Sequence, residues 1–358
     1  MMFGCAIGAF YAGRLADIYG RRFMMRVISV LFILSSFGVG FVDSASLFIF
    51  YRVIGGVCVG AISILVPMYI AEVSAALYRG RLGAIQNMMV ILGLCAAFLS
   101  NFLLTELSGG SLVVFWFGFE TWRWMLWGEL LPAILFFIML FFVPESPRYL
   151  VIAGKNAKAS QVLTRLFGQL AGEAKLMEIV FSLTGQDQPK LTDLKNKRTG
   201  KVQHVLWIGI GLAAFQQLIG INIFYYYGVM MFESLGFNES DAIFINVLGA
   251  IFSFVASIIA MLFIDKWGRK KLLLIGSIGI FSCLLCLSFT LFQIDKGAVL
   301  PFLGSLAYTH LAVLLVYLYL IFFNISWGPV MWVMLGEIFP NQIRGSGLAV
   351  AVLSALAH

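Results

Sequence analysis

The sequence predicts an all-α protein that crosses a membrane many times and is built from two related helical bundles. Hydrophobic residues make up 61% of its 358 positions, and its mean hydropathy of +0.97 is far above that of a soluble domain. Charged residues account for only 11% of the chain, and most of them lie in short clusters between long apolar stretches. One charged pattern occurs twice in the same order, which indicates two related halves.

Ten apolar stretches are candidates for membrane spans. A spanning helix needs about 20 predominantly apolar residues, so the first and the last stretch are short for a complete span. We expect the spans at 1–16, 23–42, 46–71, 82–104, 123–143, 204–231, 242–264, 271–293, 309–336 and 346–358.

The positions of the positive charges predict the orientation. If the first stretch ends on the cytoplasmic side, all but three of the 24 Lys and Arg residues fall on that side. The exceptions are Arg52, Arg123 and Lys296. This asymmetry follows the positive-inside rule, so the net charge of +7 reflects topology rather than binding to a nucleic acid. We therefore expect a multi-pass protein of the cell membrane with no nucleic-acid partner.

A polar stretch separates the two halves. It runs over 151–203 and contains helix-like segments at 157–170 and 173–183, but no apolar run long enough to span a membrane. We expect a cytoplasmic linker with amphipathic helices here. An N-terminal bundle over 1–150 would precede it, and a C-terminal bundle over 204–358 would follow it.

The repeated pattern places opposite charges at the cytoplasmic ends of helices. In each copy an Asp precedes a Gly-Arg pair, and a Glu further along is followed seven residues later by an Arg-Gly pair. Ion pairs between these helices could hold the inner face closed in one state and break in another. Static anchoring at lipid headgroups is the alternative, but the repetition favours gating. The candidates are Asp17, Arg21, Arg22, Glu72, Arg79 and Arg148 in the first half and Asp265, Arg269, Glu337 and Arg344 in the second.

The sixth stretch carries three amides, Gln216, Gln217 and Asn222, in an apolar helix. Such groups are expensive in a membrane unless they face a polar cavity or another helix. Amides donate and accept hydrogen bonds without charge, which suits a neutral ligand with several hydroxyls. Asn222 and Tyr226 lie on one helical face, and Gly220 allows local unwinding. Hydrogen bonding between helices is the alternative, but three amides beside three tyrosines favour a ligand site.

The ninth stretch contains Gly328 and Pro329, which we expect to break the helix, with Trp332 one turn later. An aromatic face beside amides is typical of a site for a sugar ring, which stacks on the aromatic group while its hydroxyls form hydrogen bonds. The alternative for a Trp is the interfacial belt. The position of Trp332 near the middle of the stretch favours the site.

Arg52 is a charge in the outer part of the third stretch. A cation there needs a carboxylate or a carbonyl as partner, and the sequence offers no obvious one.

Five groups of motifs together resemble the sugar porter family of the major facilitator superfamily. The resemblance covers nearly the whole chain. It implies twelve helices, about ten of them present here, in two pseudo-symmetric bundles that rock to give alternating access. The motifs are Gly13–Asp17 with Gly20–Arg22, Pro67–Glu72, Pro144–Arg148, Gln216–Asn222 and Trp327–Pro340.

The resemblance also implies roles for individual residues. Asn87 stands where the family has a sugar-binding Gln, and this departure leaves the substrate open among pentoses, hexoses and polyols. Tyr226 would close the outer side over the substrate. The sugar contacts would be Gln216, Gln217, Asn222, Gly328 and Trp332, with Phe323 as a further aromatic contact.

By the same matching, the chain would begin at the second family helix and stop inside the eleventh. In proton symporters of the family, helix one carries an acid that pairs with the residue matching Arg52, and this position is neutral in facilitators. The acid that would decide between the two lies in helix one, which this chain lacks by the same matching. We expect sugar:proton symport with Arg52 as the proton-coupling partner. Facilitative uniport of a sugar or polyol stays an alternative.

Other classes of function have less support in the sequence. An enzyme would need a catalytic cluster, but the chain has only three His and no HExxH motif. We expect no cofactor and no metal, because Cys283 and Cys286 lack a second pair of ligands. A sensor or an inactive fragment that does not transport is a further alternative.

The expected partners are a monosaccharide, the lipid bilayer and, for symport, a proton. We expect a monomer in a bacterial inner membrane.

Overall fold

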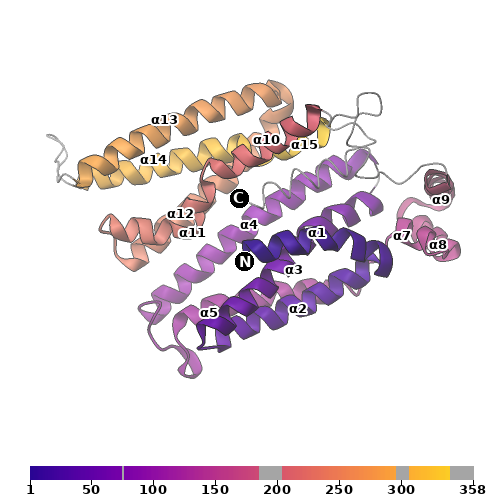
Figure 1. Ribbon diagram of the computed structural model, residues 1–358, viewed down its shortest axis with the longest axis horizontal. Helices are drawn as coiled ribbons and strands as arrows, with labels where there is room; N and C mark the ends of the chain where they lie inside the picture. The colour runs from indigo at the N-terminus through magenta and orange to yellow at the C-terminus, as the bar shows by residue number, and fades with distance from the viewer. Residues whose placement is uncertain (75, 185–203, 296–305, 339–358) are drawn as a thin grey trace. The chain divides into compact units, whose positions relative to one another are not determined.

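A computed structural model describes residues 1–74, 76–184, 204–295 and 306–338 (Figure 1). Helices form nearly all of this part of the chain, and its one isolated β-bridge joins Val114 to Glu120. The described residues fall into two compact units. The first unit contains 1–74, 76–86 and 122–184, and the second contains 87–121, 204–295 and 306–338.

Eight helices belong wholly or mainly to the first unit. The core of this unit lies between α1, α2, α3 and the end of α6, and it includes Ala16, Met25, Cys58 and Leu65. The helices are α1 (Met2–Tyr19), α2 (Arg21–Phe41), α3 (Ala45–Val73), α5 (Thr121–Trp127), α6 (Leu130–Met139), α7 (Pro147–Ile152), α8 (Asn156–Phe167) and α9 (Gln169–Thr184).

The second unit has its core between α11, α12, α13 and α14, around Phe224, Phe232 and Tyr319. Helix α4 (Ala76–Ser108) begins in the first unit and belongs to the second from residue 87 onward. A short 3-10 turn, η1 (Trp116–Gly118), follows it. The remaining helices are α10 (His204–Leu218), α11 (Ile221–Ser234), α12 (Glu239–Trp267), α13 (Arg269–Asp295), α14 (Leu306–Ile325) and α15 (Trp327–Ile338).

Eight segments of the described residues are long and apolar enough to cross a membrane. They match the second to the ninth stretch predicted from the sequence. The first predicted stretch forms α1, which is 18 residues long, and the last lies outside the described residues. The spans are Arg21–Phe41, Ala45–Val73, Met88–Ser108, Thr121–Met139, Val205–Ser234, Glu239–Ile264, Arg269–Ile294 and Tyr308–Met331.

Three of these spans are interrupted. Between α10 and α11, Gly220 has φ +90°, so the unwinding predicted at this glycine is confirmed. Between α5 and α6 the helix is interrupted at Gly128 and Glu129. The third break lies at Ser326, so the prediction of a break at Gly328–Pro329 was wrong by two residues. Proline is tolerated in the first turn of a helix, where its missing N–H leaves no bond unmade.

Helices α1 and α3 pack backbone to backbone through glycines. A Cβ on Gly60 would overlap the carbonyl of Cys5, and one on Gly8 would overlap the carbonyl of Val57. Small residues that let helices approach closely are how helices associate in lipid, where the hydrophobic effect gives no net attraction. This contact holds α1 in the first unit.

The polar segment after α6 forms helices as the sequence predicts. Helices α8 and α9 cover most of the two helix-like segments, and they pack closely where Gly172 meets the backbone of Leu163 and Thr164. The division of the chain into bundles at 1–150 and 204–358 with a linker between them stays a prediction.

We expect Gly60→Ala to destabilise the protein by about 1–3 kcal/mol, because the new methyl group forces α1 away from α3. Thermal melting of purified protein, followed by size exclusion, measures the effect. Gly93→Ala is the matched control: a Cβ at Gly93 meets no atom within 4 Å, and alanine favours a helix by up to about 1 kcal/mol. Equal melting temperatures for the two variants would contradict the close packing.

Candidate functional site

Arg21 lies at the centre of a buried ion-pair network at the predicted cytoplasmic end of the first unit. Its side chain is only 3% exposed. Nε and Nη2 each donate to the Glu72 carboxylate at 3.0 Å. Nη2 also donates to Asp17 at 2.6 Å, and Nη1 donates to the carbonyl of Ala16 at 3.0 Å. This forked geometry makes the strongest and most directional pairing that a guanidinium forms with a carboxylate.

The segment that follows α6 joins this network. The Ser146 hydroxyl donates to Glu72, and the same oxygen accepts from the backbone N–H of Tyr149, which caps the start of α7. Glu145 accepts from the backbone N–H of Arg22 at 3.1 Å. Glu72 of α3 and Glu145, which lies between α6 and α7, thus hold the end of α1 close to the starts of α2 and α7.

Two further arginines cap the end of α6. Arg22 donates to the carbonyls of Leu140 and Phe141, and Arg26 donates to Leu140 at 3.2 Å. The last carbonyls of a helix have no partner within the helix, and cations there also offset its dipole. Arg148 lies exposed on α7, and among the described contacts it does not reach this network.

The second copy of the charged pattern is only partly within the described residues. Arg269 donates from Nη1 to the carbonyl of Ile264 at 3.4 Å, at the end of α12. The side chains of Arg79, Asp265 and Glu337 and all of Arg344 lie outside the described residues. Gating by these charges stays a prediction for both halves.

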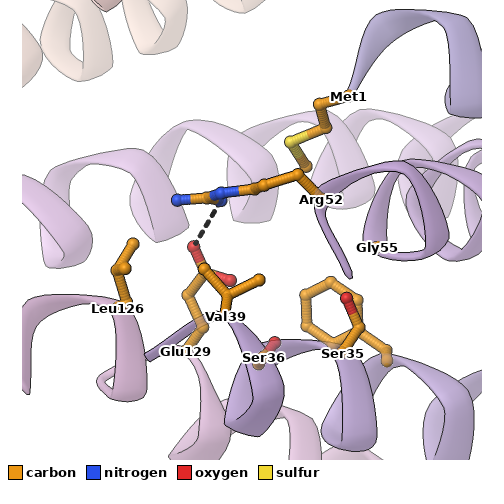
Figure 2. A pocket seen from close by; sticks show the side chains of 9 residues that line it. Met1, Ser35, Ser36, Val39, Arg52, Gly55, Leu126 and Glu129 are labelled. Carbon is orange, nitrogen blue, oxygen red and sulfur yellow. Dashed lines mark ion pairs between the residues drawn. The ribbon is translucent and has the colours of Figure 1, made fainter. Parts of the chain in front are cut away.

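Arg52 has a partner that the sequence did not reveal. Its Nη1 lies 4.0 Å from Oε1 of Glu129, at the break between α5 and α6 (Figure 2). The expectation that Arg52 lacks an obvious partner in this chain was therefore wrong. The tertiary fold, rather than sequence spacing, brings the two charges together. A lone carboxylate within an apolar stretch was the available signal, because such groups are rare in membrane spans.

A small cavity surrounds this ion pair. Ser35 and Ser36 of α2 line it, and Ser36 lies within hydrogen-bonding reach of the Glu129 carboxylate (Figure 2). The Arg52 side chain is 29% exposed, and that of Glu129 is 43% exposed. The cavity of about 10 Å³ has room for about one water molecule. Both charges are therefore held in a polar recess that water can reach.

The predicted amides meet at the break between α10 and α11. Asn222 donates from Nδ2 to Oε1 of Gln217 at 3.2 Å. Gln216, Gln217 and Asn222 are all half-buried, and Tyr226 is 64% exposed. The turn at Gly220 thus brings amides from two helices to one place, with part of their surface still accessible.

A directed chain of hydrogen bonds lies beside these amides. Ser253 donates to the carbonyl of Gly249 at 2.8 Å, so its oxygen accepts from the Tyr225 hydroxyl at 3.0 Å. Tyr225 has then used its only proton, and it accepts from Nδ2 of Asn324 at 3.2 Å. The chain connects α11, α12 and α14 and satisfies polar groups that would otherwise be costly in the core.

This chain fixes the orientation of the Asn324 amide. Nδ2 donates both to Tyr225 and to the carbonyl of Leu320 at 2.8 Å, so both of its protons are used. Oδ1 consequently faces the other way. It lies 3.7 Å from the position of a Cβ on Gly328. The network presents a hydrogen-bond acceptor beside one of the predicted sugar contacts.

Comparison with known proteins identifies the family. The family model described as "Sugar (and other) transporter" matches residues 1–357. The chain belongs to the sugar porter family of the major facilitator superfamily. Two curated sugar porters are similar to it over 98% of its length. The "Glucose transport protein" of Synechocystis sp. is 42% identical over 74% of its own length. The "D-xylose-proton symporter" of Escherichia coli K12 is 32% identical over 71% of its own length.

A solved sugar porter structure supports the same assignment. The partially occluded inward open conformation of the xylose transporter XylE from E. coli aligns with a TM-score of 0.78 and 30% identity. The alignment covers 99% of this chain and 76% of that chain. The all-α fold, the family and the multi-pass membrane location predicted from the sequence are confirmed. As a sugar porter, the protein is a transporter and not an enzyme.

Several predicted sugar contacts of this sugar porter can be located. Phe323 is 6% exposed within the core of the second unit, and its ring lies 3.8 Å from the position of a Cβ on Gly328. The side chains of Asn87 and Trp332 lie outside the described residues. The assignment of Gln216, Gln217, Asn222, Tyr226, Phe323 and Gly328 as sugar contacts stays a prediction.

Four residues of these networks illustrate what the sequence did not predict. Tyr225 and Asn324 are on helices that are far apart in the sequence, and their pairing depends on how α11 and α14 pack. Ser146 is within a recognised motif, but its bond to Glu72 is a tertiary contact. Glu129 is the fourth.

In the part of the chain that the structure describes, no three His, Cys, Asp or Glu side chains form a metal site.

We expect Glu72→Gln to destabilise the protein by about 3 kcal/mol or more, because it leaves the buried guanidinium of Arg21 without its main counter-charge. Asp17→Asn is the matched control, since the Asp17 side chain is 58% exposed and an exposed pair contributes less than about 1 kcal/mol. Melting curves in detergent compare the two. Similar losses in both variants would contradict the central place of Glu72.

Proposed function

We propose that this sugar porter carries a monosaccharide together with a proton. The pairing of Arg52 with Glu129 carries this proposal. Ionisable residues within membrane spans are costly and commonly mark ion pathways or proton relays. Glu129 is a carboxylate that can gain and lose a proton, and Arg52 stays charged at all working pH values. The pair lines a recess with room for about one water molecule, and water beside the carboxylate suits a group that exchanges a proton.

The strength of this ion pair suits a switch. Two unit charges 4 Å apart attract by about 1 kcal/mol in water and by about 4 kcal/mol at the effective dielectric of a protein surface. Both side chains are partly exposed, so the attraction falls between these values. Protonation of Glu129 removes it and frees the Arg52 guanidinium. A change of this size is enough to shift a balance between two conformations several-fold.

The polar groups of the second unit suit a monosaccharide. Gln217 and Asn222 offer donors and acceptors at the break between α10 and α11. The Oδ1 of Asn324 adds an acceptor beside Gly328. Uncharged groups of both kinds match the hydroxyls of a pentose or hexose. The names of the relatives, a glucose transport protein and a D-xylose-proton symporter, support the same substrate class.

Alternating access would use the interrupted spans. The breaks between α10 and α11, between α14 and α15 and between α5 and α6 each lie within a few residues of a proposed sugar or proton group. Broken helices at a binding site are a recurring feature of transporters, because their ends can bend while the rest of each helix stays rigid. Movement at these breaks would open the sugar site to one side of the membrane at a time.

We expect Tyr225→Phe to raise the KM for sugar about five-fold or more, because Asn324 then loses one of the two hydrogen bonds that orient its amide. The loss of one oriented hydrogen bond corresponds to about 1–3 kcal/mol. Uptake of labelled sugar into proteoliposomes measures KM. Tyr317→Phe is the control, since it removes a similar bond, to the carbonyl of Ile245. An unchanged KM in Tyr225→Phe would show that Asn324 does not bind the sugar.

We expect Glu129→Gln to keep sugar exchange but to lose proton movement, because glutamine cannot carry the proton. Exchange of labelled sugar and the alkalinisation of a weakly buffered medium during sugar entry are measured on the same proteoliposomes. Asp241→Asn, an exposed change at the start of α12, should leave both unchanged. Sugar-dependent proton uptake in Glu129→Gln would rule out this carboxylate as the carrier. Sugar entry without proton uptake in the wild type would favour uniport of a sugar or polyol.

A further inference from the structure

The connection between α4 and α5 is an apolar loop. Residues 109–119 carry no charge, and the eight consecutive positions from Leu112 to Phe119 are all apolar, aromatic or glycine. Glu120 follows them. Helix α4 spans the membrane before this loop, and the span Thr121–Met139 follows it. A connection between two spans must lie at a membrane surface. The predicted orientation makes it the outer surface.

Hydrogen bonds hold this loop as a short hairpin. The N–H and the hydroxyl of Thr121 both donate to the carbonyl of Val113 at 3.0 Å. Phe115 donates its N–H to the carbonyl of Phe119 at 2.8 Å. The rings of Phe115 and Trp116 stack with centroids 4.8 Å apart. The tip of the hairpin therefore has a defined shape.

The base of the hairpin is fixed to the second unit. The backbone N–H of Ser111 donates to the Glu239 carboxylate at 3.2 Å, at the start of α12. The Ser108 hydroxyl donates to the carbonyl of Gly110 at 3.0 Å. These bonds hold the polar part of the loop at its base and leave the apolar part at its tip.

The tip presents large apolar side chains outward. Leu112 is 76% exposed, Val114 63%, Trp116 61% and Phe117 88%. Phe117 also has φ +57°, a left-handed conformation that costs free energy for a residue other than glycine. A hydrogen-bonded and strained turn that exposes four such side chains is difficult to explain if only water surrounds it.

The apolar surface of the tip continues that of the preceding span. Leu99, Leu103 and Leu107 of α4 lie four residues apart, hence on one helical face, and are 47%, 50% and 71% exposed. This face belongs to a membrane-spanning segment, so its leucines are suited to contact with lipid acyl chains. The chain runs from this face directly into the hairpin.

We propose that the hairpin over 109–120 inserts its tip into the outer leaflet, at the boundary between lipid headgroups and acyl chains. Trp and other aromatic side chains favour this depth, where an apolar ring and a polar group can both be accommodated. The absence of charge before Glu120 and the continuity with the α4 surface favour lipid over an aqueous or protein partner. The insertion anchors the outer ends of α4 and α5 at a fixed depth.

A nitroxide probe tests the depth of the tip. Phe117→Cys, in the full chain with the exposed Cys286 replaced by Ser, is labelled and reconstituted in phosphatidylcholine vesicles. The same protein without the new cysteine gives the background signal. We expect the probe to collide more with oxygen than with a water-soluble nickel complex, at a depth of about 5–10 Å below the headgroups. Ser44→Cys, in the exposed loop before α3, should show the opposite preference.

Two outcomes would overturn the proposal. Equal access of the nickel complex to positions 117 and 44 would place the tip in water. Shielding of position 117 from both reagents, with a change when sugar is added, would make the hairpin a lid over the transport path instead. If Phe117→Cys does not fold, Leu112→Cys at the 76% exposed position provides the same readout.

Discussion

A polar group within an apolar, membrane-spanning chain must find its partner inside the protein, and this constraint organises the whole structure. Lipid offers no hydrogen bonds, so each unpaired group there costs several kcal/mol. The buried guanidinium of Arg21 is bonded to Glu72, Asp17 and a backbone carbonyl. Asn324, Tyr225 and Ser253 form a chain in which every proton has one acceptor. Each such network fixes how neighbouring helices pack.

The same constraint links structure to transport. The groups that remain partly accessible, Arg52 with Glu129 and Gln217 with Asn222, lie at or beside breaks in the spans. At a break the backbone itself exposes donors and acceptors, so polar side chains and water gather there at less cost than within a regular helix. During transport, polar side chains must exchange their partners within the protein for the substrate or a proton. In this chain the breaks in the spans provide such side chains.

The sequence was sufficient for the fold class, because apolar length decides which helices span a membrane and the motifs are specific to the family. It also predicted the unwinding at Gly220, since only glycine adopts that backbone conformation without strain. Pairings between distant segments were not predictable. Glu129 meets Arg52, and Tyr225 orients Asn324, only through the packing of separate helices. The break at Ser326 precedes the expected one because proline fits within the first turn of α15.

The claim that sugar and proton move together is tested most directly by accumulation in proteoliposomes that contain the unmodified protein. Labelled sugar is placed at equal concentration inside and outside, and the outer medium is then made one pH unit more acidic. Coupling to one proton predicts that sugar accumulates inside by up to about ten-fold, the ratio that matches the imposed free energy of about 1.4 kcal/mol. Sugar concentrations that stay equal on both sides, with exchange still active, would contradict the account.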